Sequence, residues 1–223
     1  CIFLYICIFL FFISPTTQLF AHGISEADKA AMLSGGYLEY IRLGAVHMVT
    51  GYDHLLFIVG VLFFLYRRRD VILYVSMFTL GHSLTLLVGV ISDLQVNAYL
   101  IDAIIGLSVV YKAFDNIGGF ERFFGISPNN RSAVFIFGLF HGLGLATKLQ
   151  EMTMSAEGLL TNLLSFNLGV ELGQIVALLY LLLILSLGQR LTKNPGIGIA
   201  VNILLMAGGF ALTAYQLAYF FAV

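Results

Sequence analysis

The chain has 223 residues and a formal net charge of −1 at pH 7, and it is 60% hydrophobic and only 10% charged. Soluble domains carry about 25% charged residues, so this composition excludes a soluble protein. We predict an all-α fold, a polytopic helical membrane protein with six transmembrane helices after an N-terminal signal peptide. The signal peptide is assigned to residues 1–21 and a single six-helix transmembrane domain to residues 22–223.

The N-terminal segment is a short apolar run that ends in a polar patch and Ala21. This pattern is typical of a secretory signal peptide, and an uncleaved first helix is the alternative. Both cysteines, Cys1 and Cys7, lie in this segment, so the cleaved protein would have neither disulfides nor thiolate ligands. Cleavage would also make His22 the first residue, where the free amine and the imidazole can chelate a metal together.

Six apolar segments are expected to span the membrane, at about 38–66, 71–91, 97–114, 132–149, 160–187 and 197–220. The loops after the first, third and fifth segments contain eight of the eleven Lys and Arg residues. By the positive-inside rule these loops are cytoplasmic, so both mature termini are expected outside. Acidic residues predominate on the outer side and would attract a cation.

The first span contains His47, Asp53 and His54 in "GAVHMVTGYDHLLF". A charged side chain at the bilayer centre costs about 2.5 to 3.5 kcal/mol on insertion scales, so such residues indicate function by default. The two histidines are seven residues apart, which in a continuous helix separates them by about 10 Å along the axis. They can bind one ion only if the helix opens, for example at Thr50 and Gly51; otherwise they are successive stations along a path.

The next three spans contribute His82 in "TLGHSLTL", Asp102, and His141 in "GLFHG". Two interpretations of His82 and Asp102 remain open. Both can bind metal, or both can be structural, with His82 hydrogen-bonded to Thr79 and Ser83 and Asp102 orienting a histidine. A lone intramembrane histidine is usually a packing residue, but four of them with three carboxylates favour a functional cluster.

The fifth span, "SFNLGVELGQ", places Asn167, Glu171 and Gln174 on one helical face as a polar stripe. The sixth span has no ionisable group and is expected to be scaffold. Close helix packing would bring the polar faces together as a pocket that opens outward. Glycines four residues apart allow such packing, and they are Gly138, Gly142, Gly169 and Gly173.

Short internal matches indicate a repeat. "GAVH" in the first span compares with "GLFH" in the fourth, and "FTLGHS" in the second with "FNLGVE" in the fifth. The two halves run in opposite directions, so this would be a 3+3 inverted repeat, a common transporter plan with its site at the repeat interface. Chance is the alternative for matches this short.

The segments "HMVTGYDHLLF", "FTLGHSLTL", "DAIIGLSVVYKAFDN", "FGLFHGLGLA" and "FNLGVELGQ" together resemble the HupE/UreJ family of hydrogenase and urease accessory membrane proteins. Members are regarded as nickel or cobalt permeases with a cleavable signal peptide and about six spans. The resemblance implies that His47, Asp53, His54 and His141 handle the metal and that Glu171 joins them. The stretch "ATKLQ" after His141 departs from the family pattern.

These observations favour a permease for a divalent transition-metal cation, with nickel first and cobalt or another metal as alternatives. Imidazole and carboxylate suit Ni, Co, Zn, Cu(II) or Fe without choosing among them. The ion would cross through the outward-opening pocket without ATP hydrolysis by this chain, which has no P-loop motif. The predicted metal residues are His47, Asp53, His54, His82, His141 and Glu171, with Asp102, Asn167, Gln174 and His22 beside them or along the pathway.

We expect no catalytic residue and no permanently bound cofactor, since the divalent ion is cargo. Membrane lipid and metalloenzyme maturation machinery are the expected partners, nucleic acid is not, and the expected location is a bacterial cytoplasmic membrane. The alternatives are an intramembrane metal-dependent hydrolase, and a metal- or haem-binding accessory or sensor protein without flux. The spacing of His47 and His54 favours a path over a hydrolase site, whereas His82 and His141 could pair across a haem.

Overall fold

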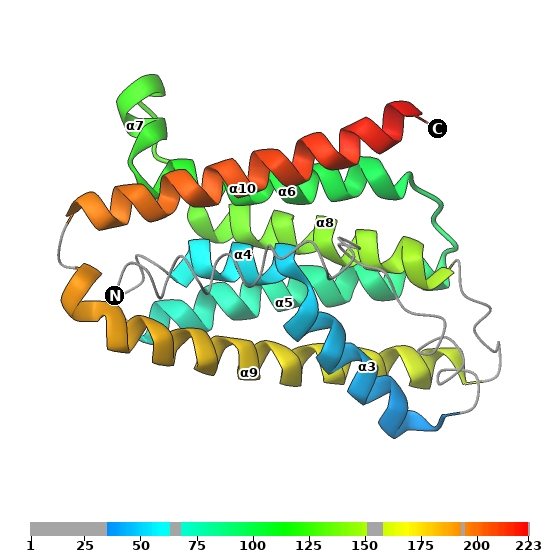
Figure 1. Cartoon of the computed structure of the whole chain (residues 1–223). Helices are drawn as coiled ribbons and strands as arrows, with labels where there is room; N and C mark the ends of the chain where they lie inside the picture. Colours follow the sequence, from blue (N-terminus) through cyan, green and yellow to red (C-terminus); the bar gives the residue numbers. More distant parts are fainter. Residues whose placement is uncertain (1–34, 63–67, 151–157, 193–194, 223) are drawn as a thin grey trace.

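The computed structural model of the chain describes residues 35–62, 68–150, 158–192 and 195–222, and within them every regular element is an α-helix (Figure 1). The predicted signal peptide and His22 lie outside the described residues. The helices are α3 (Tyr37–Thr50), α4 (Tyr52–Leu62), α5 (Arg68–Ile91), α6 (Ala98–Asn116), α7 (Gly119–Phe124), α8 (Asn130–Gln150), α9 (Leu159–Thr192) and α10 (Pro195–Ala222).

Each of the six predicted spans coincides with a long helix or, for the first, with the bent pair α3 and α4. Among the described residues, α5, α8, α9 and α10 are long and apolar enough to cross a membrane, and the bent pair would be a fifth span. The 19-residue helix α6 carries three charged side chains, Asp102, Lys112 and Asp115. The helical class is therefore confirmed, whereas the count of six spans stays a prediction.

The first span is broken between its two histidines. Helix α3 ends at Thr50, Gly51 is extended (φ −68°, ψ 104°), and the two halves meet at a bend of 64°. Glycine is the weakest helix former after proline, and the Thr50 hydroxyl donates to the Val46 carbonyl at 2.7 Å, as hydroxyl side chains do where helices bend. A Cβ at Gly51 would lie 2.8 Å from Nδ1 of His54, so the break also depends on glycine.

Helices α5 and α8 run side by side with their backbones in contact. A Cβ at Gly81 would collide with the Phe135 carbonyl oxygen, and one at Gly138 would collide with the Phe78 carbonyl oxygen. Without a strong hydrophobic force between helices in lipid, such close backbone packing holds them together. The small residues predicted for α8 therefore lie at a helix interface.

Helices α3 and α9 pack through glycines in the same register as α8 and α5. A Cβ at Gly44 would collide with the Phe166 carbonyl oxygen, and one at Gly169 with the Ile41 carbonyl oxygen. In the sequence match, Gly44 pairs with Gly138 and Gly169 with Gly81, so matched glycines make matched contacts in the two helix pairs. The glycines predicted for helix packing in the fifth span thus do contact another helix.

The third helix pair, α6 with α10, is built around two glycines that face each other. A Cβ at Gly106 would lie 3.0 Å from the Gly209 carbonyl oxygen and 2.9 Å from the Thr213 nitrogen. A Cβ at Gly209 would lie 2.8 Å from the Gly106 oxygen and 3.0 Å from the Val110 nitrogen. Because 106 and 110 on one helix correspond to 209 and 213 on the other, this contact has a local two-fold symmetry.

We predict that Gly169→Ala destabilises the protein, because the new methyl group would push α3 and α9 apart. Overpacking of this kind costs about 1 to 3 kcal/mol. Thermal unfolding of the full chain in detergent, followed by circular dichroism, should show a lower midpoint. Gly208→Ala is the matched control, since its Cβ would meet no atom closer than Leu56 Cδ1 at 3.9 Å. Equal midpoints for the two variants would contradict the close contact.

Candidate metal centre

Four histidines from four helices meet near the middle of the bundle. The ring centre of His54 on α4 lies 5.2 Å from that of His47 on α3, 5.8 Å from His82 on α5 and 4.9 Å from His141 on α8. His54, His82 and His141 are fully buried, and His47 is partly buried. His54 is therefore the centre of the group, which we call the histidine cluster.

The local backbone explains how these rings come together. In a straight helix, His47 and His54 would lie about 10 Å apart along the axis. The 64° bend at Gly51 instead brings their ring centres to 5.2 Å. Close packing of α5 and α8 brings in the other two rings. A Cβ at Gly142 would collide with the His82 carbonyl oxygen, so this glycine, next to His141, lets the two helices place His82 and His141 at the same level.

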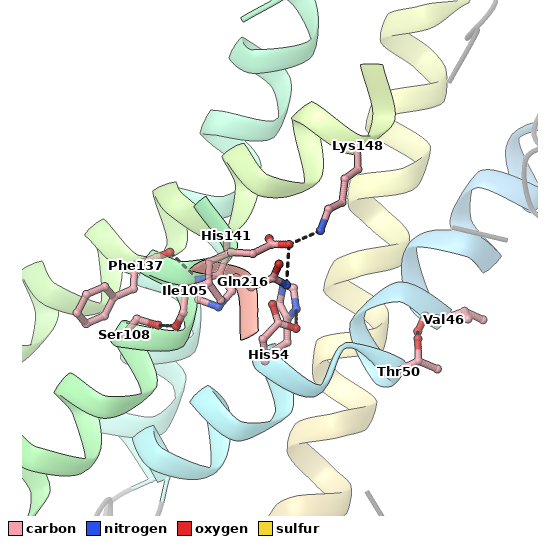
Figure 2. Close-up of polar contacts among 11 residues, drawn as sticks. Val46, Thr50, His54, Ile105, Ser108, Phe137, His141, Lys148 and Gln216 are labelled. Carbon is pink, nitrogen blue, oxygen red and sulfur yellow. Dashed lines mark hydrogen bonds and ion pairs between the residues drawn. The ribbon is translucent and has the colours of Figure 1, made fainter. Parts of the chain in front are cut away.

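Hydrogen bonds to Nδ1 orient two of the rings. Nδ1 of His54 lies 3.1 Å from Oδ1 of Asp53, which is 2% exposed, and Nδ1 of His141 lies 2.8 Å from the Phe137 carbonyl oxygen (Figure 2). Carboxylate and carbonyl oxygens only accept, so Nδ1 donates in both contacts and Nε2 carries the lone pair. Nε2 is then the nitrogen that can bind a metal, with its basicity raised by the partner of Nδ1.

Phenylalanine rings surround the cluster. The Phe78 ring centre lies 6.1 Å from that of His54, 6.2 Å from His82 and 4.9 Å from His141. Phe57 packs against His141 at 5.5 Å, and Phe166 packs against His47 at 6.1 Å. An apolar shell limits water access and lowers the local dielectric constant. These phenylalanines were not predicted from the sequence, although the spacing of Phe78 from His82 by four positions is a detectable signal.

The cluster offers pairs of ligands rather than a closed cage. Within the described part of the chain, no three His, Cys, Asp or Glu side chains lie close enough to hold one ion as they stand. Two imidazoles that share an ion at about 2.1 Å have ring centres roughly 5 to 6 Å apart. The distances from His54 to His47 and His82 fall in this range, and the 4.9 Å to His141 is just below it. The arrangement suits an ion that passes between successive pairs.

Of the three polar residues predicted to share one face of α9, two are buried and one is exposed. Asn167 and Gln174 are buried, with 6% and 2% exposure, and the Thr79 hydroxyl of α5 donates to Oε1 of Gln174 at 2.5 Å. Glu171 is exposed. At about 100° per residue, Glu171 is rotated roughly 40° to 60° from the other two, which is enough to leave the interface. The structure does not bring Glu171 to the histidine cluster.

Asp102 lies at the outer end of α6, if the sides follow the positive-inside rule. Its Oδ2 is 2.7 Å from Nζ of Lys148 on α8 and accepts a hydrogen bond from Nε2 of Gln216 on α10 at 3.3 Å (Figure 2). Asp102 is 7% exposed, so this is a largely buried ion pair. The contact joins three helices and was not foreseen, because Lys148 lies 46 residues away in the sequence.

A cavity of about 400 Å³ lies near the other end of α6, among α4, α5, α6, α7 and α8. Its lining includes Tyr74, Lys112, Asp115, Asn116 and Asn130, and Nζ of Lys112 lies 2.7 Å from Oδ2 of Asp115. The positive-inside rule assigns this end to the cytoplasm. This cavity therefore lies on the side opposite to the outward opening that the sequence predicts.

The sequence model of the family described as HupE / UreJ protein matches residues 25–223. No curated protein and no solved structure matches the chain.

We expect Asp53→Ala to weaken nickel binding by about 10- to 100-fold, the usual loss when the partner that orients a histidine ligand is removed. The measurement is equilibrium dialysis of radioactive nickel against the detergent-solubilised full chain. Ser108→Ala is the control, because its buried hydroxyl donates to the Ile105 carbonyl on its own helix at 2.7 Å. Unchanged affinity in folded Asp53→Ala would contradict the orienting role.

Proposed function

Because the chain belongs to the HupE/UreJ family, we propose that it is a membrane permease for a divalent transition-metal cation, with nickel as the first candidate and cobalt as the next. The family implies a role in nickel or cobalt uptake or an accessory function. The observation that carries the proposal is the histidine cluster centred on His54, buried among helices that are long and apolar enough to cross a membrane.

The ion exchanges water for imidazole nitrogens and moves between neighbouring pairs of rings. Nε2 of His54 and Nε2 of His141 bind it in turn, and His47 and His82 lie beside His54 as further ligands. Conduction requires binding that is strong enough to admit the ion and weak enough to release it. A cluster with no preformed three-ligand cage among the described residues meets this requirement better than a closed site would.

Access alternates between the two sides. The three innermost histidines are fully buried, and the described cavity lies toward the expected cytoplasmic end. We assign the outward-opening pocket to a second conformation, in which the ion arrives from the acidic outer face. No ATP hydrolysis by this chain is needed, because a membrane potential supplies about 2.3 kcal/mol per charge per 100 mV.

The proposed architecture is a 3+3 inverted repeat of six spans, in which α6 is the third. Three observations support it: the pair α3 and α9 shares its glycine register with α8 and α5, the contact of Gly106 with Gly209 has local two-fold symmetry, and the matched motifs contain His47 and His141. The histidine cluster then lies at the repeat interface, the usual place for a transporter site.

The proposed location is a bacterial cytoplasmic membrane, with both mature termini outside after removal of the signal peptide. The charged loops and the apolar helices support this orientation. The chain holds no permanent cofactor in this proposal, and metalloenzyme maturation machinery receives the ion.

The hydrolase and haem alternatives have less support. Phe78 packs against His54, His82 and His141, and it fills space that a porphyrin or a substrate would need beside the rings. The family is one of transporters and accessory proteins.

We predict that proteoliposomes containing the protein accumulate radioactive nickel and that His54→Ala reduces the rate to that of empty vesicles. The reason is that His54 is the ligand common to every pair in the cluster. The measurement is time-resolved uptake of radioactive nickel into vesicles with an inside-negative membrane potential. Cobalt, zinc and copper are added as competitors.

Ser108→Ala, with a buried hydroxyl outside the cluster, should retain wild-type uptake. Wild-type vesicles that match empty vesicles for every metal would refute the permease and leave an accessory or sensor role. Equal uptake by the wild type and His54→Ala would refute the role of the cluster.

A further inference from the structure

The ion pair of Asp102 with Lys148 lies next to the histidine cluster along α8. A Cβ at Gly144 would be 3.5 Å from Oδ1 of Asp102, an ordinary contact distance, so the carboxylate lies beside this turn of α8. Along α8, Gly144 follows His141 by three residues, a rise of about 4.5 Å, and Lys148 follows His141 by seven residues. The carboxylate therefore lies about one helical turn outward from the His141 position.

The pair has the features of a cation position that is already filled. Three helices contribute to it, the Asp102 side chain is 6% exposed, and the ammonium lies 2.7 Å from the carboxylate. An ionised carboxylate without a partner is strongly disfavoured in a buried position, so a cation beside Asp102 stabilises its ionised form. Lys148 supplies it, but the side chain of Lys148 is itself 17% exposed and lies two residues from the end of α8.

We propose that Asp102 is a cation-binding position on the outer side of the histidine cluster, and that the Lys148 ammonium occupies it until a divalent cation displaces it. This inference rests on the proposed function and deepens it by naming the residue that regulates access to the cluster. A lysine near a helix end can extend toward the interface, so its retraction needs no helix movement. The ion, with twice the charge, is attracted more strongly to the same carboxylate.

Polar side chains also lie at the outer end of α8. Nε2 of Gln95 donates to Oε1 of Gln150 at 3.2 Å and to Oδ1 of Asp93 at 2.9 Å. Gln95 and Asp93 are exposed. These oxygens can bind an arriving ion at the outer surface. The exchange leaves the buried Asp102 carboxylate beside a cation before and after the ion arrives.

The first test measures nickel binding to the detergent-solubilised full chain by equilibrium dialysis. Lys148→Met should lower the dissociation constant by about fivefold or more, because the competing ammonium is gone. Lys148→Arg keeps the charge and should behave as the wild type. The double variant Lys148→Met with Asp102→Asn should lose the gain. Equal affinities for folded Lys148→Met and Lys148→Arg would overturn the proposal.

The second test uses the unmodified protein, so it does not depend on the folding of a variant. An amine-reactive reagent is applied with and without nickel, and modification of each lysine is followed by mass spectrometry. Nickel should speed the modification of Lys148 by about fivefold or more if it displaces the ammonium. Lys112, whose Nζ lies 2.7 Å from Oδ2 of Asp115, is the internal control and should not change.

The outcomes separate this inference from the permease proposal. Nickel binding by the wild type without any change at Lys148 would overturn the displacement alone. Absence of binding of nickel, cobalt, zinc and copper by the wild type would overturn both.

Discussion

The partners of buried ionisable groups are the constraint on which the described helix bundle depends. An imidazole, a carboxylate or an ammonium loses its hydration when it is removed from water, and a hydrogen bond or an ion pair offsets that cost. The Asp53 carboxylate lies against His54, the Phe137 carbonyl accepts from His141, and Lys148 lies against Asp102. Because the first two partners take Nδ1, the contacts that make burial of His54 and His141 possible also leave Nε2 as the nitrogen that would bind the proposed metal.

Glycine makes these partnerships possible, since polar groups on different helices meet only when the backbones approach closely. Gly142 abuts the His82 backbone. Gly51 interrupts the first span and leaves room for the contact of Asp53 with His54. A β-carbon at Gly142 would push α5 away from α8, and one at Gly51 would press against the His54 ring.

Much of the fold could be predicted from the sequence, because apolar segment length and glycine spacing are local properties. The six helical segments and the glycine interface of α8 are examples. The sequence could not reveal the partner of Asp102, because that contact depends on how α6 and α8 are placed against each other. It also could not reveal the exposure of Glu171, because a rotation of about 40° decides whether a residue at the edge of a stripe is covered.

In the proposed permease, two ion pairs flank the histidine cluster along α6. Asp102 and Asp115 lie 13 residues apart, about 20 Å along the axis, and each is 2.7 Å from a lysine ammonium. Between these ends, the cluster would offer imidazole nitrogens, which bind a transition metal while neutral, beside the Asp53 carboxylate. In this proposal Asp53 offsets part of the charge of an ion held in the cluster, and the Asp102 carboxylate on the outer side competes for the same ion.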